Sequence, residues 1–215
     1  MATRVAAAEL KGPRRTQDVR RLYQQLQRSI CRSLFGLASA LEIKGPYTRG
    51  HSDRVGGWSR QIGAALGLHA DAIDVISHAG RLHDIGKIGL PETLLRKRDA
   101  LDHDEWTLVQ NHPLIGAQIV APFEFFADGV LAIRHHHERW DGTGYPDGLA
   151  GSAIPLGARI VGVADVFDAL TSDRPYRGAL SHDMALAYLA SEAGRTFDAD
   201  VVSAFVRIVS APEPA

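Results

Sequence analysis

Histidine and aspartate residues recur along this sequence at positions where they could bind a metal ion. His83 and Asp84 are adjacent in "RLHDIGKIGL", and Lys87 follows three residues later. The other candidates are His51, His112, the triplet His135–His137 and Asp165. Each one alone has a structural explanation, such as a helix cap, a turn before a proline or a buried hydrogen bond. As a set they offer imidazole and carboxylate ligands without a thiolate, which suit iron, manganese or zinc in a hydrolytic site.

Asp165 adds a separate indication of a metal. It lies in "VADVFDALTSD", a helical stretch that is otherwise mostly apolar. A carboxylate buried there without a partner would be costly, whereas a metal ion would satisfy it. Ligands on several helices could converge in the core of a bundle, where metal sites are often built.

The elements that would position these residues are helices, and the fold class is all-α. Apolar residues at helical spacing predict a leading helix over 16–43, and no sustained period-two alternation indicates a strand. A capping box at 102–105 opens a helix that Pro113 interrupts or kinks, and Ser181 and Asp198 are expected N-caps. The remaining helices are expected over 48–67, 71–84, 126–137, 156–171, 181–193 and 198–210.

One segment does not fit a helix. Residues 138–156, "ERWDGTGYPDGLAGSAIPL", contain four glycines and two prolines, with Trp140 and Tyr145 as apolar anchors. A loop of this length in a compact domain is usually functional or disordered. Because its aromatic residues and flanking helices provide packing surfaces, we expect an ordered loop beside a site.

Composition limits the classes of protein that the chain could belong to. Its 215 residues are 45% hydrophobic and 23% charged, as in a globular protein. The single cysteine, Cys31, excludes an intrachain disulfide and predicts a reducing, cytoplasmic location. No apolar run is long enough for a membrane span, and no signal-peptide pattern is found.

Charge is distributed unevenly along the chain. Residues 1–32 carry a net charge of +6, against −7 for the rest. A basic arm could contact nucleic acid or an anionic membrane, and an Arg-rich start also resembles a transit peptide. We interpret the segment instead as the solvated face of a leading helix and expect no nucleic-acid partner.

Five blocks, in order, carry a resemblance to a known family: "YTRGHSDRV" (47–55), "HDIGKIGLPETLL" (83–95), "NHPLIGAQI" (111–119), "HHERWDGTGYPDG" (136–148) and "VADVFDALTSDRPYR" (163–177). The sequence resembles the HD-GYP family, the bacterial branch of the HD metal-dependent phosphohydrolases. The resemblance spans about 28–210. It implies an HD-domain helical bundle over 28–215 with an ordered GYP loop, preceded by a basic arm at 1–27.

The resemblance also assigns roles to single residues. It implies that Asp84 bridges two metal ions and that Lys87 faces the substrate phosphate. Gly144, Tyr145 and Pro146 form the signature loop beside the ligand, and Arg174 and Arg177 match positions that contact its phosphates. His135 falls one place before the family's histidine pair and is interpreted as a neighbour. The implied metal ligands are His51, His83, Asp84, His112, His136, His137 and Asp165.

The implied activity is hydrolysis of cyclic di-GMP to the linear dinucleotide pGpG, and in some members on to GMP, by a hydroxide held between two metal ions. Some members bind a third metal through a glutamate four residues before the first histidine. Tyr47 occupies that position here, so two divalent ions are expected. Iron or manganese is the first expectation, and zinc, magnesium and nickel are the alternatives.

Other interpretations stay open at this point. The motifs define the phosphate chemistry better than the bases, so another cyclic dinucleotide could be the substrate. A receptor that binds cyclic di-GMP without turnover, or a module that binds GGDEF-type or other signalling proteins through the GYP loop, is the alternative from another class. The leading helix has a leucine stripe at Leu22, Leu26, Ile30, Leu34, Leu37 and Leu41, which predicts either a homodimer or docking within one chain.

Overall fold

The computed structural model describes residues 11–44, 50–97, 99–173 and 178–210. They form two compact units, with the boundary between Gly36 and Leu37. Apart from one isolated bridge between Ala193 and Phe197, the described residues form helices and no strand, which confirms the all-α class. The predicted helix start at Thr48, Tyr47 and the candidate phosphate ligands Arg174 and Arg177 lie outside these residues.

The leading helix predicted over 16–43 is present as α2 (Lys11–Lys44), which crosses the unit boundary. In the first unit, Leu22 and Leu26 of the predicted leucine stripe are 59% and 57% exposed. This part of the stripe therefore leaves apolar surface on the helix. No helix within the described ranges is long and apolar enough to cross a bilayer.

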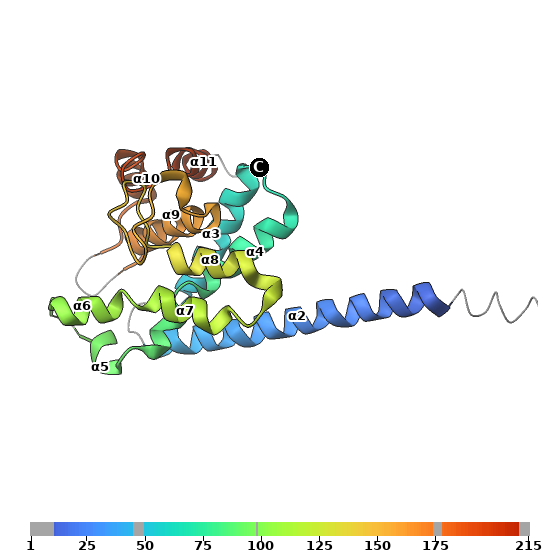
Figure 1. Cartoon of the computed structure of the whole chain (residues 1–215). Coiled ribbons are helices and arrows are strands. Elements are labelled where there is room, and N and C mark those ends of the chain that lie inside the picture. The colour runs from blue at the N-terminus through green and yellow to red at the C-terminus, as the bar shows by residue number, and fades with distance from the viewer. Residues whose placement is uncertain (1–10, 45–49, 98, 174–177, 211–215) are drawn as a thin grey trace, which may run out of the picture. The chain divides into compact units, whose positions relative to one another are not determined.

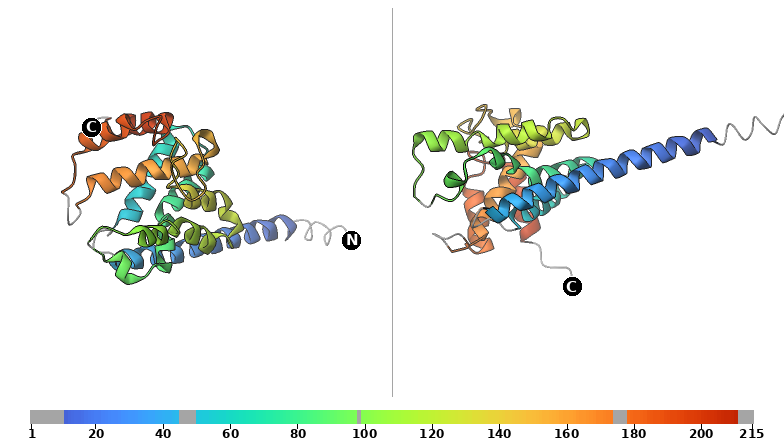
Figure 2. Two further views of the ribbon diagram at one scale, coloured as in Figure 1. Left: turned by 60° about the vertical axis from the view of Figure 1, so that its left-hand side comes forward. Right: turned by 90° about the horizontal axis from the view of Figure 1, so that it is seen from below.

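Four helices form the centre of the second unit, and each packs on at least two of the others. They are α3 (His51–Ala65), α4 (Ala70–Leu82), α8 (Ala127–His135) and α9 (Leu156–Thr171). In Figures 1 and 2, α10 and α11 lie at one end of this group, and α5, α6 and α7 lie at the other. The bounds of these outer helices are α5 Glu92–Leu95, α6 His103–Val109, α7 His112–Val120, α10 His182–Ser191 and α11 Ala199–Val209. Within the described ranges, three short 3₁₀ helices lie between the α-helices: η1 (Ile85–Gly89), η2 (Glu124–Phe126) and η3 (Gly151–Ala153).

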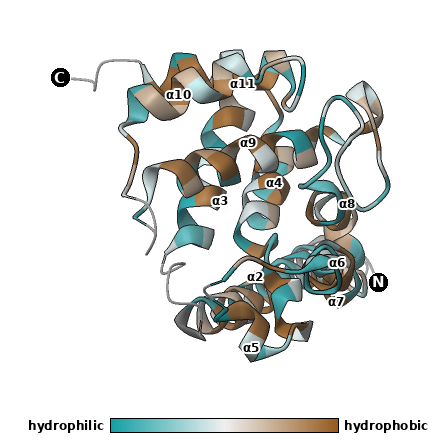
Figure 3. Cartoon of the chain, turned by 90° about the vertical axis from the view of Figure 1, so that its left-hand side faces the viewer, coloured by the Kyte–Doolittle hydropathy of each residue, from teal (hydrophilic) through white to brown (hydrophobic). Residues whose placement is uncertain are grey.

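An aromatic cluster joins α3, α9 and α11 in the core. The ring centroid of Phe167 lies 5.4 Å from that of Trp58 and 4.7 Å from that of Phe205, in edge-to-face geometry. Each such pair contributes about 0.5–1.5 kcal/mol beyond the area that it buries. Figure 3 shows the apolar residues of these helices in brown. The cluster fixes α9, which carries Asp165.

Several predicted local signals are present in the structure. Ser181 and Asp198 are the N-caps of α10 and α11, and their side chains accept backbone N–H groups of the first turn. Asp102 and Glu105 form the predicted capping box at the start of α6. Such caps contribute about 0.5–2 kcal/mol each.

Two boundaries differ from the prediction. Pro113 does not kink a longer helix, because α6 ends at Val109 and Pro113 lies in the first turn of α7. The missing N–H of proline costs nothing at that position. Asp84 lies beyond α4, which ends at Leu82, and instead precedes η1. Asp84 is thus the residue before a 3₁₀ helix and not the last residue of an α-helix.

Candidate metal centre

Three buried histidines bond the backbone through one ring nitrogen and leave the other free. They are His83 at the end of α4, His112 at the start of α7 and His136 at the end of α8. In each, Nδ1 donates to the carbonyl oxygen three residues earlier in the chain, at 2.7–2.8 Å. Because a carbonyl oxygen only accepts, Nδ1 carries the proton and Nε2 carries a lone pair. The local backbone thus selects the tautomer that can bind a metal.

These Nε2 atoms converge. The Nε2 atoms of His112 and His136 are 3.4 Å apart, although neither has a proton to share with the other. The Nε2 of His83 is buried and has no hydrogen-bond partner among the described residues. An unpaired buried polar atom costs about 1–3 kcal/mol. A cation among these nitrogens would remove that cost, so the residues fit a metal centre.

Two carboxylates lie among the histidines. The Oδ1 of Asp84 is 3.3 Å from the Nε2 of His112, and its Oδ2 is 3.5 Å from the Nε2 of His83. The Oδ1 of Asp165 is 3.3 Å from the Nε2 of His51 and 3.7 Å from that of His83. The ligand atoms form two groups of three, each within 4.8 Å: His51, His83 and Asp84, and then His112, His136 and His137. Two groups, with Asp84 facing both, suit two ions.

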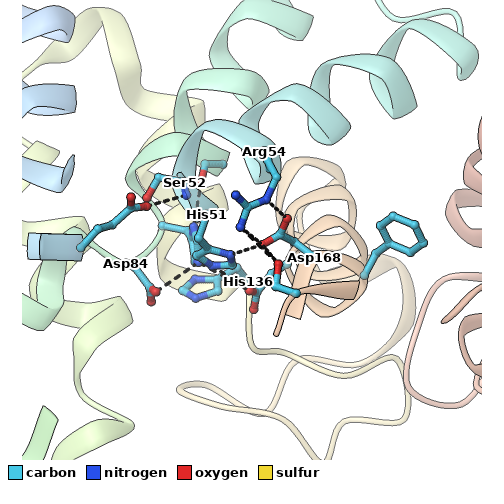
Figure 4. Close-up of polar contacts among 12 residues, drawn as sticks. His51, Ser52, Arg54, Asp84, His136 and Asp168 are labelled. Atoms are coloured by element: carbon cyan, nitrogen blue, oxygen red, sulfur yellow. Dashed lines mark hydrogen bonds and ion pairs between the residues drawn. The ribbon is translucent and has the colours of Figure 1, made fainter. Parts of the chain in front are cut away.

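A buried carboxylate behind His51 orients its ring. The Nδ1 of His51 lies 2.7 Å from the Oδ2 of Asp168, which is 2% exposed. Arg54 donates to both oxygens of Asp168, at 2.5 and 3.0 Å (Figure 4). A carboxylate that bonds the second nitrogen of a ligating histidine fixes its tautomer and makes it a stronger ligand. Sequence reasoning missed Asp168 and Arg54, although each lies three residues, about one helical turn, after a candidate ligand.

Burial and neighbouring charges give the cluster neutral histidines beside ionised carboxylates. Burial lowers the pKa of His83 and His136, and it lowers the pKa of His137 to about 4. Burial opposes ionisation of Asp84, but the Lys87 ammonium and neighbouring histidines outweigh it and hold the pKa of Asp84 well below its usual range. Neutral imidazole and carboxylate are the protonation states that metal binding requires.

His51 differs electrostatically from the other histidines. Burial alone would lower its pKa, but the hydrogen bonds to Asp165 and Asp168 outweigh burial and raise the pKa to about 10. The two carboxylates therefore favour positive charge at this ring. A metal ion at the Nε2 of His51 would supply the same charge, so this end of the cluster also fits a cation.

The glycine of "HDIGK" allows two segments of the site to meet. A Cβ on Gly86 would lie 1.9 Å from the carbonyl oxygen of His112 and 2.4 Å from the backbone nitrogen of Gly116. Both contacts are with backbone, which cannot move aside without moving α7. Gly86 therefore permits the close approach that brings His112 next to Asp84.

Lys87 lies on η1, at the edge of the cluster. Its Nζ is 2.6 Å from the Oδ2 of Asp84, and its side chain is 33% exposed. It places a positive charge beside the ligand carboxylate and can be reached from solvent. A phosphate at the cluster would meet this ammonium group.

The loop predicted over 138–156 is ordered beside the cluster, and it contains the short helix η3 before α9 begins at Leu156. The ring of Tyr145 lies 4.8 Å from that of His137, and burial raises the pKa of Tyr145. Glu138 accepts the backbone N–H groups of Asp147 and Leu149, and these bonds hold the later part of the loop against its first residue. A Cβ on Gly144 would lie 2.3–2.6 Å from backbone atoms of 137–139, so only glycine fits there.

His135 points away from the ligand groups. Its Nε2 lies 2.8 Å from the Oδ2 of Asp147, and its Nδ1 bonds the carbonyl oxygen of Leu131. Arg134 donates to both oxygens of the same Asp147. The structure thus connects His135 to the loop, in agreement with its interpretation as a neighbour.

A cavity of about 340 Å³ opens beside the cluster. His136, His137 and Asp165 contribute to its lining at the metal centre. The lining also includes Trp106, Trp140, Tyr145, Tyr188, Arg139 and Arg159. A cavity with aromatic walls, cationic groups and candidate metal ligands can accommodate a phosphorylated aromatic ligand.

Comparison with known proteins shows that the chain belongs to a family. Residues 37–201 match the family described as HD domain. A cyclic di-GMP phosphodiesterase response regulator of Xanthomonas campestris is 44% identical over 177 residues, which cover 81% of this chain and 47% of the relative. A 3′3′-cGAMP-specific phosphodiesterase of Vibrio cholerae is 38% identical over 171 residues, covering 79% of this chain and 37% of the relative. The chain therefore spans less than half the length of these relatives.

Solved structures share the fold. A cyclic GMP-AMP specific phosphodiesterase of V. cholerae matches with a TM-score of 0.66 and 22% identity, over 85% of this chain and 49% of the other. An HD-GYP-type protein of Bdellovibrio bacteriovorus matches with a TM-score of 0.60 and 23% identity, over 75% and 52%. At these identities the likeness concerns the arrangement of helices.

Proposed function

Because the chain belongs to the HD domain family and carries the sequence blocks of its HD-GYP branch, we propose that it is a metal-dependent phosphodiesterase acting on cyclic di-GMP. The observation that carries this proposal is the convergence of histidine Nε2 atoms on Asp84 and Asp165. Relatives named as cyclic di-GMP phosphodiesterases support the substrate.

The proposed product is the linear dinucleotide pGpG. One water molecule is consumed: its oxygen joins phosphorus, the bond from phosphorus to the 3′ oxygen breaks, and that oxygen leaves as a hydroxyl group. The same reaction at the remaining phosphodiester would give GMP. A proton must reach the leaving oxygen in each step.

We propose that the centre holds two divalent metal ions, with iron or manganese as the first candidates. When bound, the ions would activate water and neutralise charge on the phosphate oxygens. The donor set of nitrogen and oxygen atoms, without sulfur, supports these metals. The ligands would be His51, His83, Asp84, His112, His136, His137 and Asp165.

The remaining site residues would bind and orient the substrate. Lys87 adds a positive charge next to Asp84, where the developing charge on phosphate oxygens would be stabilised. Arg174 and Arg177 are proposed to bind the phosphates through their planar guanidinium groups. The GYP loop, Gly144, Tyr145 and Pro146, would contact the nucleotide beside His137.

A second cyclic dinucleotide is the competing substrate. One relative at 38% identity is named a 3′3′-cGAMP-specific phosphodiesterase. The same phosphate chemistry would serve either ligand, so the two candidates differ only in the bases that the site accepts.

Anaerobic purification under reducing conditions, metal analysis and product identification test the proposal. We expect about two metal ions per chain, and conversion of cyclic di-GMP to pGpG with bound Fe(II) or Mn(II). Faster turnover of 3′3′-cGAMP would favour the second substrate. Tight binding of cyclic di-GMP without turnover in any tested metal would favour a receptor. Absence of bound metal, with no activation by Fe(II) or Mn(II), would overturn the enzyme proposal.

We also propose a homodimer through α2, since Leu22 and Leu26 leave apolar surface on that helix. Signalling proteins of the GGDEF type would be partners at the GYP loop. A cytoplasmic location stays a prediction from the single cysteine.

A further inference from the structure

The cavity beside the metal centre contains a positioned guanidinium group that the proposed hydrolysis does not use. Arg159 extends from α9, and its Nη1 donates to the Oδ2 of Asp198 at 2.5 Å. Its guanidinium carbon lies 5.7 Å from the ring centroid of Trp140. Asp198 is 6% exposed and caps α11, so both contacts hold the arginine in place. Arg159 is therefore preorganised on the cavity wall.

This guanidinium retains free hydrogen-bonding capacity. Of its donor atoms, only Nη1 meets an acceptor among the described residues, and Nε is buried without a partner. The side chain is 18% exposed and contributes to the lining of the cavity. A guanidinium has five N–H donors. Nη2 and one N–H of Nη1 thus remain without an acceptor among the described residues, and together they can donate two parallel hydrogen bonds to a ligand.

The rest of the cavity wall favours a flat aromatic ligand. Tyr188, on α10, is 44% exposed, and its ring stacks on no other ring in the described part of the chain. Trp140 is fixed by two backbone bonds, from its N–H to Thr196 and from the N–H of Gly151 to its carbonyl oxygen. A fixed wall with a free aromatic face stacks a planar ring at little entropic cost.

The donor groups of Arg159 favour guanine over adenine as the planar ring. Arginine forms paired hydrogen bonds to O6 and N7 of guanine, which are both acceptors. Adenine presents an amino group in place of O6, and a guanidinium donor would face that donor. We propose that this cavity is a guanine pocket, in which Arg159 reads the acceptor edge of the base and Tyr188 stacks on its ring.

The inference deepens the proposed function and rests on it in one respect: the base belongs to the nucleotide whose phosphate lies at the metal centre. The cavity includes His136, His137 and Asp165 as well as Arg159, so one nucleotide can contact both. Its volume of about 340 Å³ lies at the small end of ligand pockets, which suits one nucleotide rather than a whole dinucleotide. Any cyclic dinucleotide with one guanine could therefore use the pocket.

Binding of GMP and AMP tests the pocket without turnover, because neither contains a phosphodiester. Isothermal titration of the full chain should show tighter binding of GMP. Arg159→Lys, which keeps a positive charge for Asp198 but lacks the planar fork, should weaken GMP binding about 5- to 100-fold, as expected for loss of one paired base contact. AMP binding should change little. Tyr188→Leu should weaken both nucleotides.

Two controls separate this inference from the proposed function. Arg207→Lys alters an exposed arginine of α11 and should leave the ratio of GMP to AMP affinity unchanged. Hydrolysis of bis(p-nitrophenyl) phosphate, a diester without bases, by the wild-type chain reports on the metal centre alone. Equal affinity of the wild-type chain for GMP and AMP, or an unchanged ratio in Arg159→Lys, would overturn the guanine pocket even if the diester is hydrolysed. Failure to hydrolyse any diester would instead count against the proposed function, and the GMP and AMP titrations would still decide the pocket.

Discussion

The Nδ1 of His51 and the Oδ2 of Asp168 lie 2.7 Å apart, although 117 residues separate them in the chain. This bond links the first residue of α3 to the last turn of α9 and leaves the Nε2 of His51 facing Asp165 at 3.3 Å. Arg54 donates to both oxygens of Asp168 and so holds the carboxylate against His51. A carboxylate outside the proposed ligand set thus determines how one proposed ligand is presented.

Asp168→Asn should weaken metal binding by about 10- to 100-fold, the usual effect of losing a carboxylate behind a ligating histidine. The amide can still accept from the Nδ1 of His51, but it removes the charge that Arg54 and His51 share. Competition with a chelator of known affinity measures the change. Asp104→Asn, on the exposed side of α6, is the matched control. An unchanged metal affinity in Asp168→Asn would contradict the proposed role of this residue.

Asp84→Ala should abolish hydrolysis and reduce the metal content, because this carboxylate faces His83 and His112 with different oxygens. The fold should stay intact, since Asp84 lies between α4 and η1 and is not an apolar core residue. Metal analysis, circular dichroism and turnover of cyclic di-GMP would be measured together. Asp99→Ala, at an exposed loop position, serves as control. If Asp84→Ala retained both metals and activity, the site would have been assigned to the wrong residues.

Gly86→Ala should displace His112, because the new methyl group would lie 1.9 Å from its carbonyl oxygen. We expect loss of at least one metal ion, and a lower melting temperature as η1 and α7 separate. Gly57→Ala is the matched control: nothing lies within 4 Å of a Cβ there, and alanine favours the interior of α3. A fully metal-loaded Gly86→Ala protein with unchanged stability would show that the close approach is unnecessary.

Arg177→Ala should weaken binding of the substrate by roughly 1.5–3 kcal/mol, the value of one hydrogen bond to a charged group. Metal content should stay normal, because the role proposed for Arg177 is a contact to the phosphate. The dissociation constant of a slowly hydrolysed phosphorothioate analogue of cyclic di-GMP gives the direct measurement. Normal affinity, or loss of metal, would remove Arg177 from the proposed phosphate site.

The proposed dimer depends on the apolar residues of α2. Leu22→Glu combined with Leu26→Glu should convert a dimer to a monomer, since charge would be placed within the buried contact. Gln17→Glu combined with Gln24→Glu adds the same charge away from the stripe and should leave the dimer intact. Light scattering at micromolar concentration measures both. A monomeric wild-type chain under these conditions would eliminate the dimer.

The amino-acid sequence by itself determined the helical class, most helix limits and the set of candidate ligands. These depend on local chemistry: the spacing of apolar residues, the caps at Asp102, Ser181 and Asp198, and adjacent residue types in short blocks. Where local preferences competed, the prediction was less accurate. Pro113 fits the first turn of a helix as well as a kink, and the chain uses it to start α7.

Tertiary structure alone decided which ring nitrogens of the histidines are left to bind a metal ion and which side chains hydrogen-bond the candidate ligands. Sequence does not show that Nδ1 of three histidines bonds a carbonyl oxygen, nor that Arg54 and His51 meet on Asp168 across more than 100 residues. The same holds for Arg159, whose partner Asp198 lies 39 residues further along the chain. Such contacts arise only when packing of the helices brings distant segments together, and a hydrogen bond depends on that final distance and direction. Residue type supplies the chemistry, and packing selects the atoms that perform it.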